Sequence, residues 1–289
     1  MKYRLRVIFA PYLYILPALS LITFVTLYPA AKVFLYSFTN WSGVYYVFVG
    51  ITNFVDLVTD KVFWNVVFHN VMLLMVIPVE VVLGVIIAFL IYEKILGWRI
   101  YQIVLFLPQI FSVVVSGIVW TYLYSLQGTV NEGLRLIGLG KFTRLWLADL
   151  TFALPAVMGV IIWRDLGFAI ILFLAALLSM DSATFEAAMV DGASKAQRLV
   201  HIALPQLRNI IELYVILNII WLFNSVFDYI YVMTAGGPGY KTTVMEYYIY
   251  YIGFRQFKFG YASAVCVMLF LFILTFVILQ IKFTSTREK

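Results

Sequence analysis

Long apolar runs, separated by short polar segments, dominate the chain. Six stretches of about 20 or more residues are predominantly apolar, near 12–36, 66–92, 101–124, 153–179, 209–233 and 262–283. A helix of about 20 apolar residues crosses the roughly 30 Å of bilayer hydrocarbon. None of the runs alternates apolar and polar residues, which excludes the strands of a membrane barrel. The pattern therefore predicts an all-α, polytopic integral membrane protein with six transmembrane helices.

The composition excludes a soluble globular protein. Of the 289 residues, 64% are hydrophobic and 12% are charged, against roughly 45 to 50% and 25% in soluble domains. The single cysteine, Cys266, cannot form an internal disulfide, and with two histidines neither a metal site nor a cofactor is expected. The net charge of +6 comes from short scattered clusters rather than a basic stripe, which argues against nucleic acid as a partner.

The distribution of basic residues predicts that both termini are cytoplasmic. In this orientation the inner segments hold eleven Lys and Arg residues and the outer segments hold eight, a bias of the sign that the positive-inside rule requires. The inner residues are Lys2, Arg4, Arg6, Lys94, Arg99, Lys195, Arg198, Arg208, Lys282, Arg287 and Lys289. The first apolar run has no convincing cleavage site and is predicted to remain as the first span. Residues 1–289 are predicted to form a single domain in the plasma membrane.

The segment 181–205, between the fourth and fifth spans, is predicted to be a pair of short cytoplasmic helices. Asp181 or Ser182 suits the N-cap of the first helix. Gly192 suits the left-handed residue that ends this helix, and Pro205 suits the first turn of the helix that follows.

Two interpretations are open for the first of these helices: it lies on the membrane surface, or it docks on another protein. Its small alanines, flanked by Glu186 and Asp191, favour docking, because anionic lipid repels carboxylates and small residues allow a second backbone to approach closely. The pattern E-A-A, three residues, G, nine residues, I, one residue, L-P is met at Glu186, Ala187, Ala188, Gly192, Ile202, Leu204 and Pro205. It resembles the EAA signature of permease subunits of binding-protein-dependent ABC importers. The resemblance implies that the segment Glu186 to Gly192 seats in a groove of an ATPase subunit and couples that subunit to transport.

A glycine-rich segment after the fifth span, Gly236 to Gly239, is predicted to form a tight turn. It is not a phosphate loop, because Tyr240 rather than glycine precedes Lys241. Together with the Gly260-Tyr261-Ala262-Ser263-Ala264 stretch, it resembles carbohydrate importer permeases of the maltose and glycerol-phosphate type, on the MalF-like side of the heterodimer. The resemblance implies a carbohydrate substrate, a prokaryotic membrane, a second permease, two ATP-binding subunits and an extracytoplasmic solute-binding protein. It also implies that ATP is hydrolysed by a partner, so this chain has no catalytic residues of its own.

Ionisable residues inside spans are costly, so each indicates either a buried pair or a substrate path. Aromatic faces and polar side chains together suit sugars, and the resemblance implies that the fourth and fifth spans line a central cavity. The candidate substrate residues are Arg164, Asp165, Phe168, Trp221, Asn224, Phe227 and Asp228. A structural ion pair between Arg164 and Asp228 is the alternative.

Other polar residues lie in the second span. Glu80 is predicted to bond either a backbone group freed by Pro78 or a neighbouring helix, whereas His69 and Asn70 are predicted to be hydrated at the outer end. An ion-coupled secondary transporter is the alternative function, with Glu80 and the three charged residues of the candidate site as its relay. The docking helix argues against that carrier. A membrane enzyme is disfavoured because no cluster of His, Cys or paired carboxylates shares one membrane depth.

Overall fold

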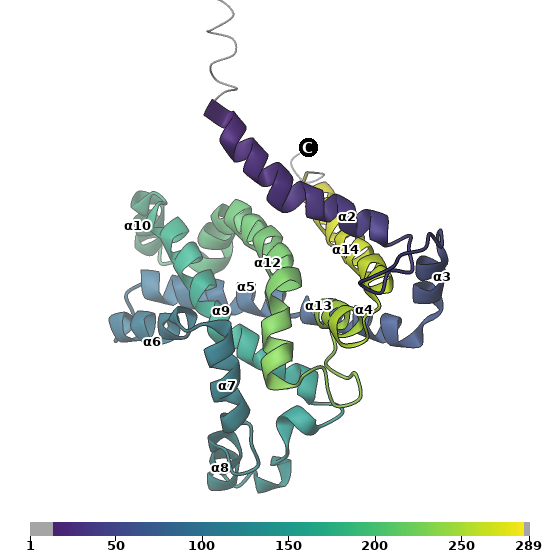
Figure 1. Cartoon of the computed structure of the whole chain (residues 1–289). Coiled ribbons are helices and arrows are strands. Elements are labelled where there is room, and N and C mark those ends of the chain that lie inside the picture. Colours follow the sequence, from purple (N-terminus) through teal and green to yellow (C-terminus); the bar gives the residue numbers. More distant parts are fainter. Residues whose placement is uncertain (1–13, 286–289) are drawn as a thin grey trace, which may run out of the picture. The chain divides into compact units, whose positions relative to one another are not determined.

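The computed structural model describes residues 14–285, and the chain in this range is built from helices (Figure 1). Strand pairing within it is limited to one isolated antiparallel bridge, between Thr39 and Phe48. The all-α prediction is therefore confirmed for the described residues. Five of the basic residues that predict the orientation, Lys2, Arg4, Arg6, Arg287 and Lys289, lie outside this range.

The helices follow one another along the chain with short connections, and η denotes π-helical or 3₁₀-helical turns. They are η1 (Thr23–Leu27), α2 (Tyr28–Tyr36), α3 (Thr52–Thr59), α4 (Lys61–Leu73), α5 (Val76–Tyr92), α6 (Trp98–Ile110), α7 (Val113–Leu123), α8 (Thr129–Leu136), η2 (Gly140–Phe142), η3 (Trp146–Ala148), α9 (Ala153–Leu178), α10 (Ser182–Val190), α11 (Lys195–Arg198), η4 (Leu199–Ala203), α12 (Leu204–Met233), α13 (Met245–Tyr250), η5 (Tyr251–Arg255) and α14 (Phe259–Ser285).

Five continuous helical stretches of the described chain are long and apolar enough to cross a bilayer. They are Tyr14–Tyr36, Lys61–Tyr92, Ala153–Leu178, Lys195–Met233 and Phe259–Lys282. These stretches correspond to five of the six predicted spans. The fourth of them is 39 residues long, about 60 Å at 1.5 Å per residue, and it begins well before the predicted span at 209. It therefore joins the second helix of the 181–205 segment to the fifth span without a break.

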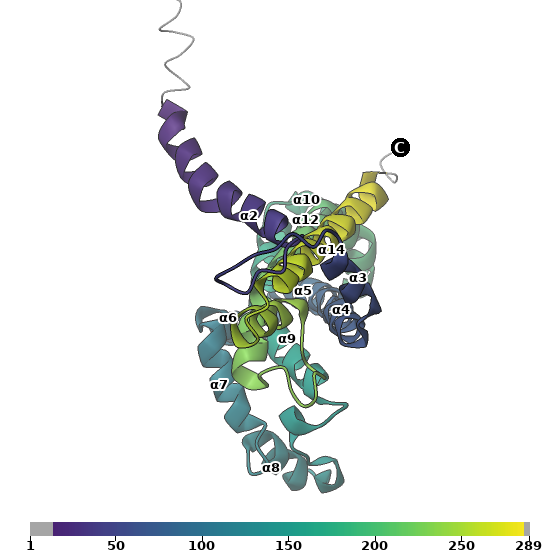
Figure 2. The same cartoon turned by 45° about the vertical axis from the view of Figure 1, so that its right-hand side comes forward.

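The third predicted span, 101–124, is not one continuous helix. It consists of α6 and α7, whose axes differ by 104° across a short break, so the two helices make up a sixth span only as a bent pair (Figures 1 and 2). Phe111 is extended at the end of α6, and the Ser112 hydroxyl caps α7 by accepting a hydrogen bond from the Val115 amide at 3.3 Å. Pro108, inside α6, cannot donate a helical backbone hydrogen bond, because it lacks an amide hydrogen. The expectation of an unbroken helix is therefore wrong, and the reason is a local stop and restart signal within the apolar run.

Two compact units share the chain. One contains residues up to Asp60 together with Tyr248–Leu271. In it the Trp41 ring packs between Tyr36, at 4.2 Å, and Phe259, at 5.0 Å between ring centroids. Gly260 lies against the Thr39 carbonyl, where a Cβ atom would collide with the backbone. This contact gives a packing reason for the glycine of the Gly260-Tyr261-Ala262 stretch.

The other unit contains Lys61–Tyr247 and the end of the chain from Phe272. Helices α5, α9 and α12 form its core, together with one aromatic residue of α10, Phe185. Gly84 of α5 faces Ala169 and Phe173 of α9, so closely that a Cβ atom at Gly84 would lie 2.8 Å from that of Ala169. The absence of a side chain at Gly84 thus allows α5 and α9 to pack closely. Both candidate sites lie within this unit.

Candidate functional site

The segment predicted to form a pair of helices does form a pair, because the signals that begin and end the first helix are local. The Asp181 carboxylate accepts a hydrogen bond from the Ala183 amide at 3.0 Å and so caps α10. Gly192 has a φ of +79°, the left-handed conformation that ends a helix. Ser194 and Gln197 then form a reciprocal capping box at the start of α11. Pro205 lies in the first turn of α12.

One side chain attaches α10 to the core. Phe185 is 3% exposed, and its ring packs 5.1 Å from that of Tyr92, the last residue of α5. The residues predicted to dock on an ATPase lie on the remaining surface. Of these, Glu186, Ala187, Asp191, Gly192, Leu204 and Pro205 are exposed, whereas Ala188 and Ile202 are half-buried. The segment therefore presents small and acidic groups outward from a fixed position.

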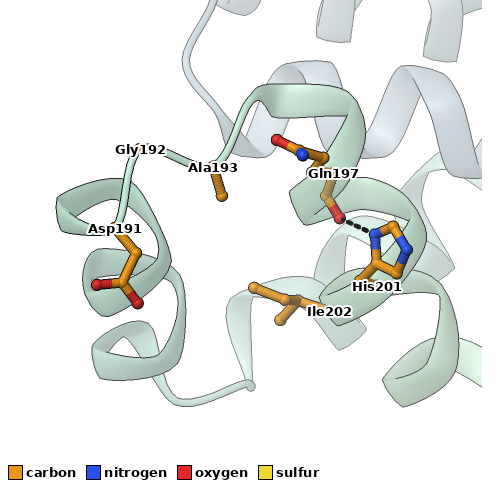
Figure 3. Close-up of a pocket in the computed structure, with 6 residues that line it drawn as sticks. All are labelled: Asp191, Gly192, Ala193, Gln197, His201 and Ile202. Carbon is orange, nitrogen blue, oxygen red and sulfur yellow. Dashed lines mark hydrogen bonds between the residues drawn. The ribbon is translucent and has the colours of Figure 1, made fainter.

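The bend between α10 and α11 encloses a shallow hollow of about 320 Å³ (Figure 3). Its lining consists of Asp191, Gly192, Ala193, Gln197, His201 and Ile202. The His201 Nδ1 atom lies 3.1 Å from the Gln197 carbonyl oxygen, so the imidazole bonds back to its own helix. The lining of the hollow thus includes an acidic side chain, Asp191, and an apolar one, Ile202.

The charged pair of the fourth span, Arg164 and Asp165, lies beside the break between α6 and α7. Arg164 donates from Nε to the Phe111 carbonyl at 3.0 Å, and from Nη1 to Asp165 Oδ1 at 2.5 Å. The Gln109 amide, with its nitrogen facing the acceptors, donates to the Arg164 carbonyl at 2.8 Å and to Asp165 Oδ1 at 3.2 Å. The alternative of an ion pair between Arg164 and Asp228 is therefore wrong. Arg164 instead satisfies a carbonyl that the broken helix leaves free.

A hollow of about 340 Å³ lies beside this cluster, between α6, α9 and α12. Its lining consists of Gln109, Asp165, Phe168, Leu217, Asn218 and Trp221. Three of the seven predicted substrate residues are among them: Asp165, Phe168 and Trp221. The structure adds Gln109, Leu217 and Asn218. Sequence reasoning missed the two amides, although each is a polar residue within an apolar run.

The other four predicted substrate residues do not line this hollow. Arg164 is turned toward Phe111. Asn224 is exposed and donates to the Ile220 carbonyl of its own helix at 2.7 Å. Phe227 stacks on Tyr231 with centroids 5.5 Å apart, and Asp228 is half-buried further along α12. Of the four candidate substrate residues on the fifth span, only Trp221 therefore lines the hollow.

Hydrogen bonds fix the wall of the hollow. Phe168 stacks on Tyr214, whose hydroxyl donates to Glu80 Oε2 of α5 at 2.9 Å. Asn218 donates to the Tyr214 carbonyl at 3.0 Å, which leaves its amide oxygen as an acceptor. Of the two roles predicted for Glu80, the bond to a neighbouring helix is thus confirmed. Its partner is α12.

His69 and Asn70 are buried rather than hydrated. His69 Nδ1 lies 2.8 Å from the Thr243 carbonyl oxygen. The Asn70 amide accepts from the Met245 amide at 2.8 Å and donates to the Glu246 carboxylate at 3.2 Å. Burial raises the pKa of Glu246 to about 8. The segment after the fifth span folds back over α4, which a prediction from single spans cannot reveal.

The glycine-rich segment forms the predicted turn. Gly236 has a φ of +79°, and its carbonyl accepts a hydrogen bond from the Thr243 hydroxyl at 2.9 Å. A Cβ atom at Gly236 would lie 2.6 Å from the Thr243 Oγ1 atom.

Across the described residues, no three His, Cys, Asp or Glu side chains come together in a group that could hold a metal ion.

Comparison with known proteins places the chain in a family. Residues 70–284 match the family model described as binding-protein-dependent transport system inner membrane component. The chain is 32% identical to the probable ABC transporter permease protein YurN of Bacillus subtilis, over 96% of this chain and 97% of that one. It is 35% identical to the multiple sugar-binding transport system permease protein MsmF of Streptococcus mutans, over 88% and 87%.

A solved structure shares the fold. It is a bacterial alginate ABC transporter, in complex with a periplasmic protein that carries an alginate pentasaccharide. The TM-score is 0.82, with 23% identity, 97% of this chain covered and 95% of that one. The family match covers most of the chain and both of its candidate sites. The chain therefore belongs to the binding-protein-dependent transport system inner membrane components, the multi-pass permeases of ABC transporters.

Proposed function

We propose that this chain is a permease subunit of an ABC importer and that it moves a carbohydrate or related polyol into the cytoplasm. The observation that carries the proposal is the outward-facing α10, which is packed on the end of one span and is linked by the bend at Gly192 to α11, the start of another. An ion-coupled carrier would have no use for such a docking helix. Two comparison proteins are named for sugars, one for multiple sugars and one for alginate, and they support the substrate class.

The proposed partners are a second permease chain, two ATP-binding subunits and an extracytoplasmic solute-binding protein. ATP hydrolysis would belong to the ATP-binding subunits, so the permease itself is not an enzyme. The span Tyr14–Tyr36 supports an assembly within the bilayer, because its apolar surface is not buried by the described residues of its own unit. Both termini and the loop 181–205 would be cytoplasmic, and residues 1–289 would act as one permease domain.

The loop 181–205 is the proposed contact with an ATP-binding subunit. Glu186, Ala187 and Ala188 would enter a groove of that subunit, because small side chains allow a close approach. The exposed carboxylate of Asp191 would face donors there. Gly192 permits the sharp turn that returns the chain toward α11, and Ile202, Leu204 and Pro205 hold the second helix of the pair beside it.

The hollow between α6, α9 and α12 is the proposed sugar site on this chain. The faces of Phe168 and Trp221 suit the apolar C–H side of a sugar ring. Gln109, Asn218 and Asp165 offer amide and carboxylate groups to its hydroxyls. Arg164 would hold Asp165 in place. Asn224, Phe227 and Asp228, further along α12, would contact the sugar at another stage of its passage.

The proposed mechanism joins the two sites through rigid helices. Closure of the ATP-binding subunits would move α10, and α11 and α12 would follow because they form one continuous helix with Pro205 at the first turn of α12. Since α12 carries Asn218 and Trp221, its movement would change one wall of the hollow. Access to the sugar would then alternate between the two sides of the membrane.

Uptake by variants of the hollow tests the sugar site. Trp221→Ala and Asn218→Ala are expected to slow transport by the assembled importer while leaving the folded yield and the affinity of the binding protein unchanged. For Asn218→Ala, the lost hydrogen bond to a sugar hydroxyl costs about 0.5 to 1.5 kcal/mol, roughly a 2- to 10-fold loss. Ile220→Ala, an exposed change on the same helix outside the hollow, is the matched control. Normal uptake by both hollow variants would refute the site.

A second test addresses the substrate class and the orientation. Binding proteins loaded with neutral oligosaccharides should stimulate ATP hydrolysis by the importer, and stimulation only by amino acid or metal-loaded proteins would refute the carbohydrate proposal. Ser194→Cys and Lys241→Cys both replace exposed residues. We expect an impermeant thiol reagent to reach the first from the cytoplasm and the second from outside. The reverse pattern would refute the orientation.

A further inference from the structure

The end of α5 contacts both helices of the docking loop through two consecutive residues. Tyr92, its last residue, packs its ring on Phe185 of α10. Glu93, the next residue, accepts two hydrogen bonds from Arg198 of α11, from Nε to Oε1 at 3.2 Å and from Nη2 to Oε2 at 2.6 Å. The docking loop, residues 181–205, is thus attached to α5 as well as to α12, which continues directly from α11.

Arg198 also fixes the backbone of the bend. Its Nη1 atom donates to the Ala193 carbonyl at 2.6 Å, directly after the left-handed Gly192. From the other side, the Ser194 amide donates to the Gln197 side chain at 2.7 Å. Because the bend is held at two successive residues, it cannot easily absorb a movement of α10 by changing its own shape.

The ion pair between Arg198 and Glu93 is more deeply buried than the other ion pair near the docking loop. The side chains of Arg198 and Glu93 are 7% and 10% exposed. A buried bidentate pair adds little net stability compared with apolar side chains of the same volume, but it restricts geometry, because each charge is satisfied only while the other remains in place. The ion pair between Arg208 and Glu212, in contrast, lies within α12 and is partly exposed.

A second hydrogen bond, further into the unit, joins α5 to α12, the helix that continues from α11. The Tyr214 hydroxyl of α12 bonds to Glu80 of α5, beside the hollow. Glu80 and Glu93 are 13 residues apart, about 20 Å along a helix. With a bond at each end of this distance, α5 and the first part of α12 are expected to move as one body rather than slide past each other.

We propose that the ion pair between Arg198 and Glu93 is the joint that transmits movement of the docking helix to α5, and that both are positioning residues for coupling. This rests on the proposed docking of α10 on an ATP-binding subunit. Without the joint, α10 would still dock, but its displacement would reach α5 only through the ring contact of Phe185 with Tyr92 and through α12. Helix α5, which carries Glu80 beside the hollow, would then follow the ATP-binding subunits less closely.

The test uses the complete importer, purified through a tag on this chain and reconstituted in liposomes. ATP hydrolysis is measured with and without saturating loaded binding protein, and the ratio gives the stimulation per assembled complex. The variants are Arg198→Gln, Glu93→Gln, Arg198→Lys and the charge swap Glu93→Arg with Arg198→Glu. Arg208→Gln is the matched control. Val190→Cys, at a side chain that is 88% exposed, reports docking by cross-linking to the ATP-binding subunit.

We expect both glutamine variants to lose stimulation by roughly 10-fold or more, with unchanged cross-linking, and the swap to recover part of it. Arg208→Gln should match the wild type. Wild-type stimulation in both glutamine variants would overturn the joint, as would loss of cross-linking in them, since the pair would then only maintain the shape of the loop. Absence of cross-linking in the otherwise unaltered chain would instead refute the proposed docking. If Arg198→Gln does not fold, Arg198→Lys decides: it keeps the charge without the two-point contact, so reduced stimulation supports the joint and full stimulation overturns it.

Discussion

Replacing Phe185 by alanine is expected to detach α10 from the rest of its unit. Phe185 is the only residue of α10 that is buried, and its ring packs on that of Tyr92. A helix of nine residues is too short to persist alone in water. Its order therefore depends on this one buried side chain.

The size of the effect follows from the burial. Truncating a buried phenylalanine to alanine costs about 3 to 5 kcal/mol. Since 1.4 kcal/mol corresponds to a factor of ten, the detached population of α10 should rise by roughly a hundredfold or more. Val190→Ala, on the same helix but 88% exposed, should change the stability by less than about 0.5 kcal/mol.

Hydrogen exchange of the purified permease, followed by mass spectrometry of its peptides, measures this population. In Phe185→Ala, the amides of α10 should exchange roughly a hundredfold faster than in the wild type, while those of α9 should keep their protection. Wild-type exchange across α10 would refute the single-anchor argument. Faster exchange throughout α5, α9 and α12 would show that Phe185 stabilises the whole core rather than the docking helix.

Three further changes have defined outcomes. Gly192→Val should reduce stimulated ATP hydrolysis with little loss of folded protein, because there is space for a side chain at this position but the φ of +79° strains a valine. Gly192→Asn should have a milder effect, because asparagine tolerates the left-handed conformation. Equal activity of the two variants would contradict this. Gly236→Ala should lower the folded yield, since its Cβ atom would collide with Thr243, and a normal yield in detergent would contradict the packing argument. Burial raises the pKa of Glu246 from 4.5 to about 8, so folding binds a proton in this window and stability should fall as the pH rises through it. Glu246→Gln should remove that slope in thermal unfolding from pH 5 to 8, and an unchanged slope would exclude Glu246 as its source.

The sequence determined those features that depend on neighbouring residues or on the solvent. Lipid offers no hydrogen bonds, so long apolar runs must become helices, and five of the six predicted spans are continuous ones. Both ends of α10 were predictable for a similar reason. An acidic N-cap at Asp181 and a glycine at 192 act within one or two helical turns.

The tertiary structure decided which polar groups meet. The break at Phe111 is stabilised by Arg164, which is 53 residues away and supplies the missing donor. His69 became buried because the distant Thr243 segment folds over it. Helical spacing places Trp221 and Asn224 near one face, but only the packing of α6 and α9 against α12 determines that Trp221 lines the hollow and Asn224 does not. The physical reason is that a side chain's direction along one helix is local, whereas its surroundings depend on which helices pack beside it.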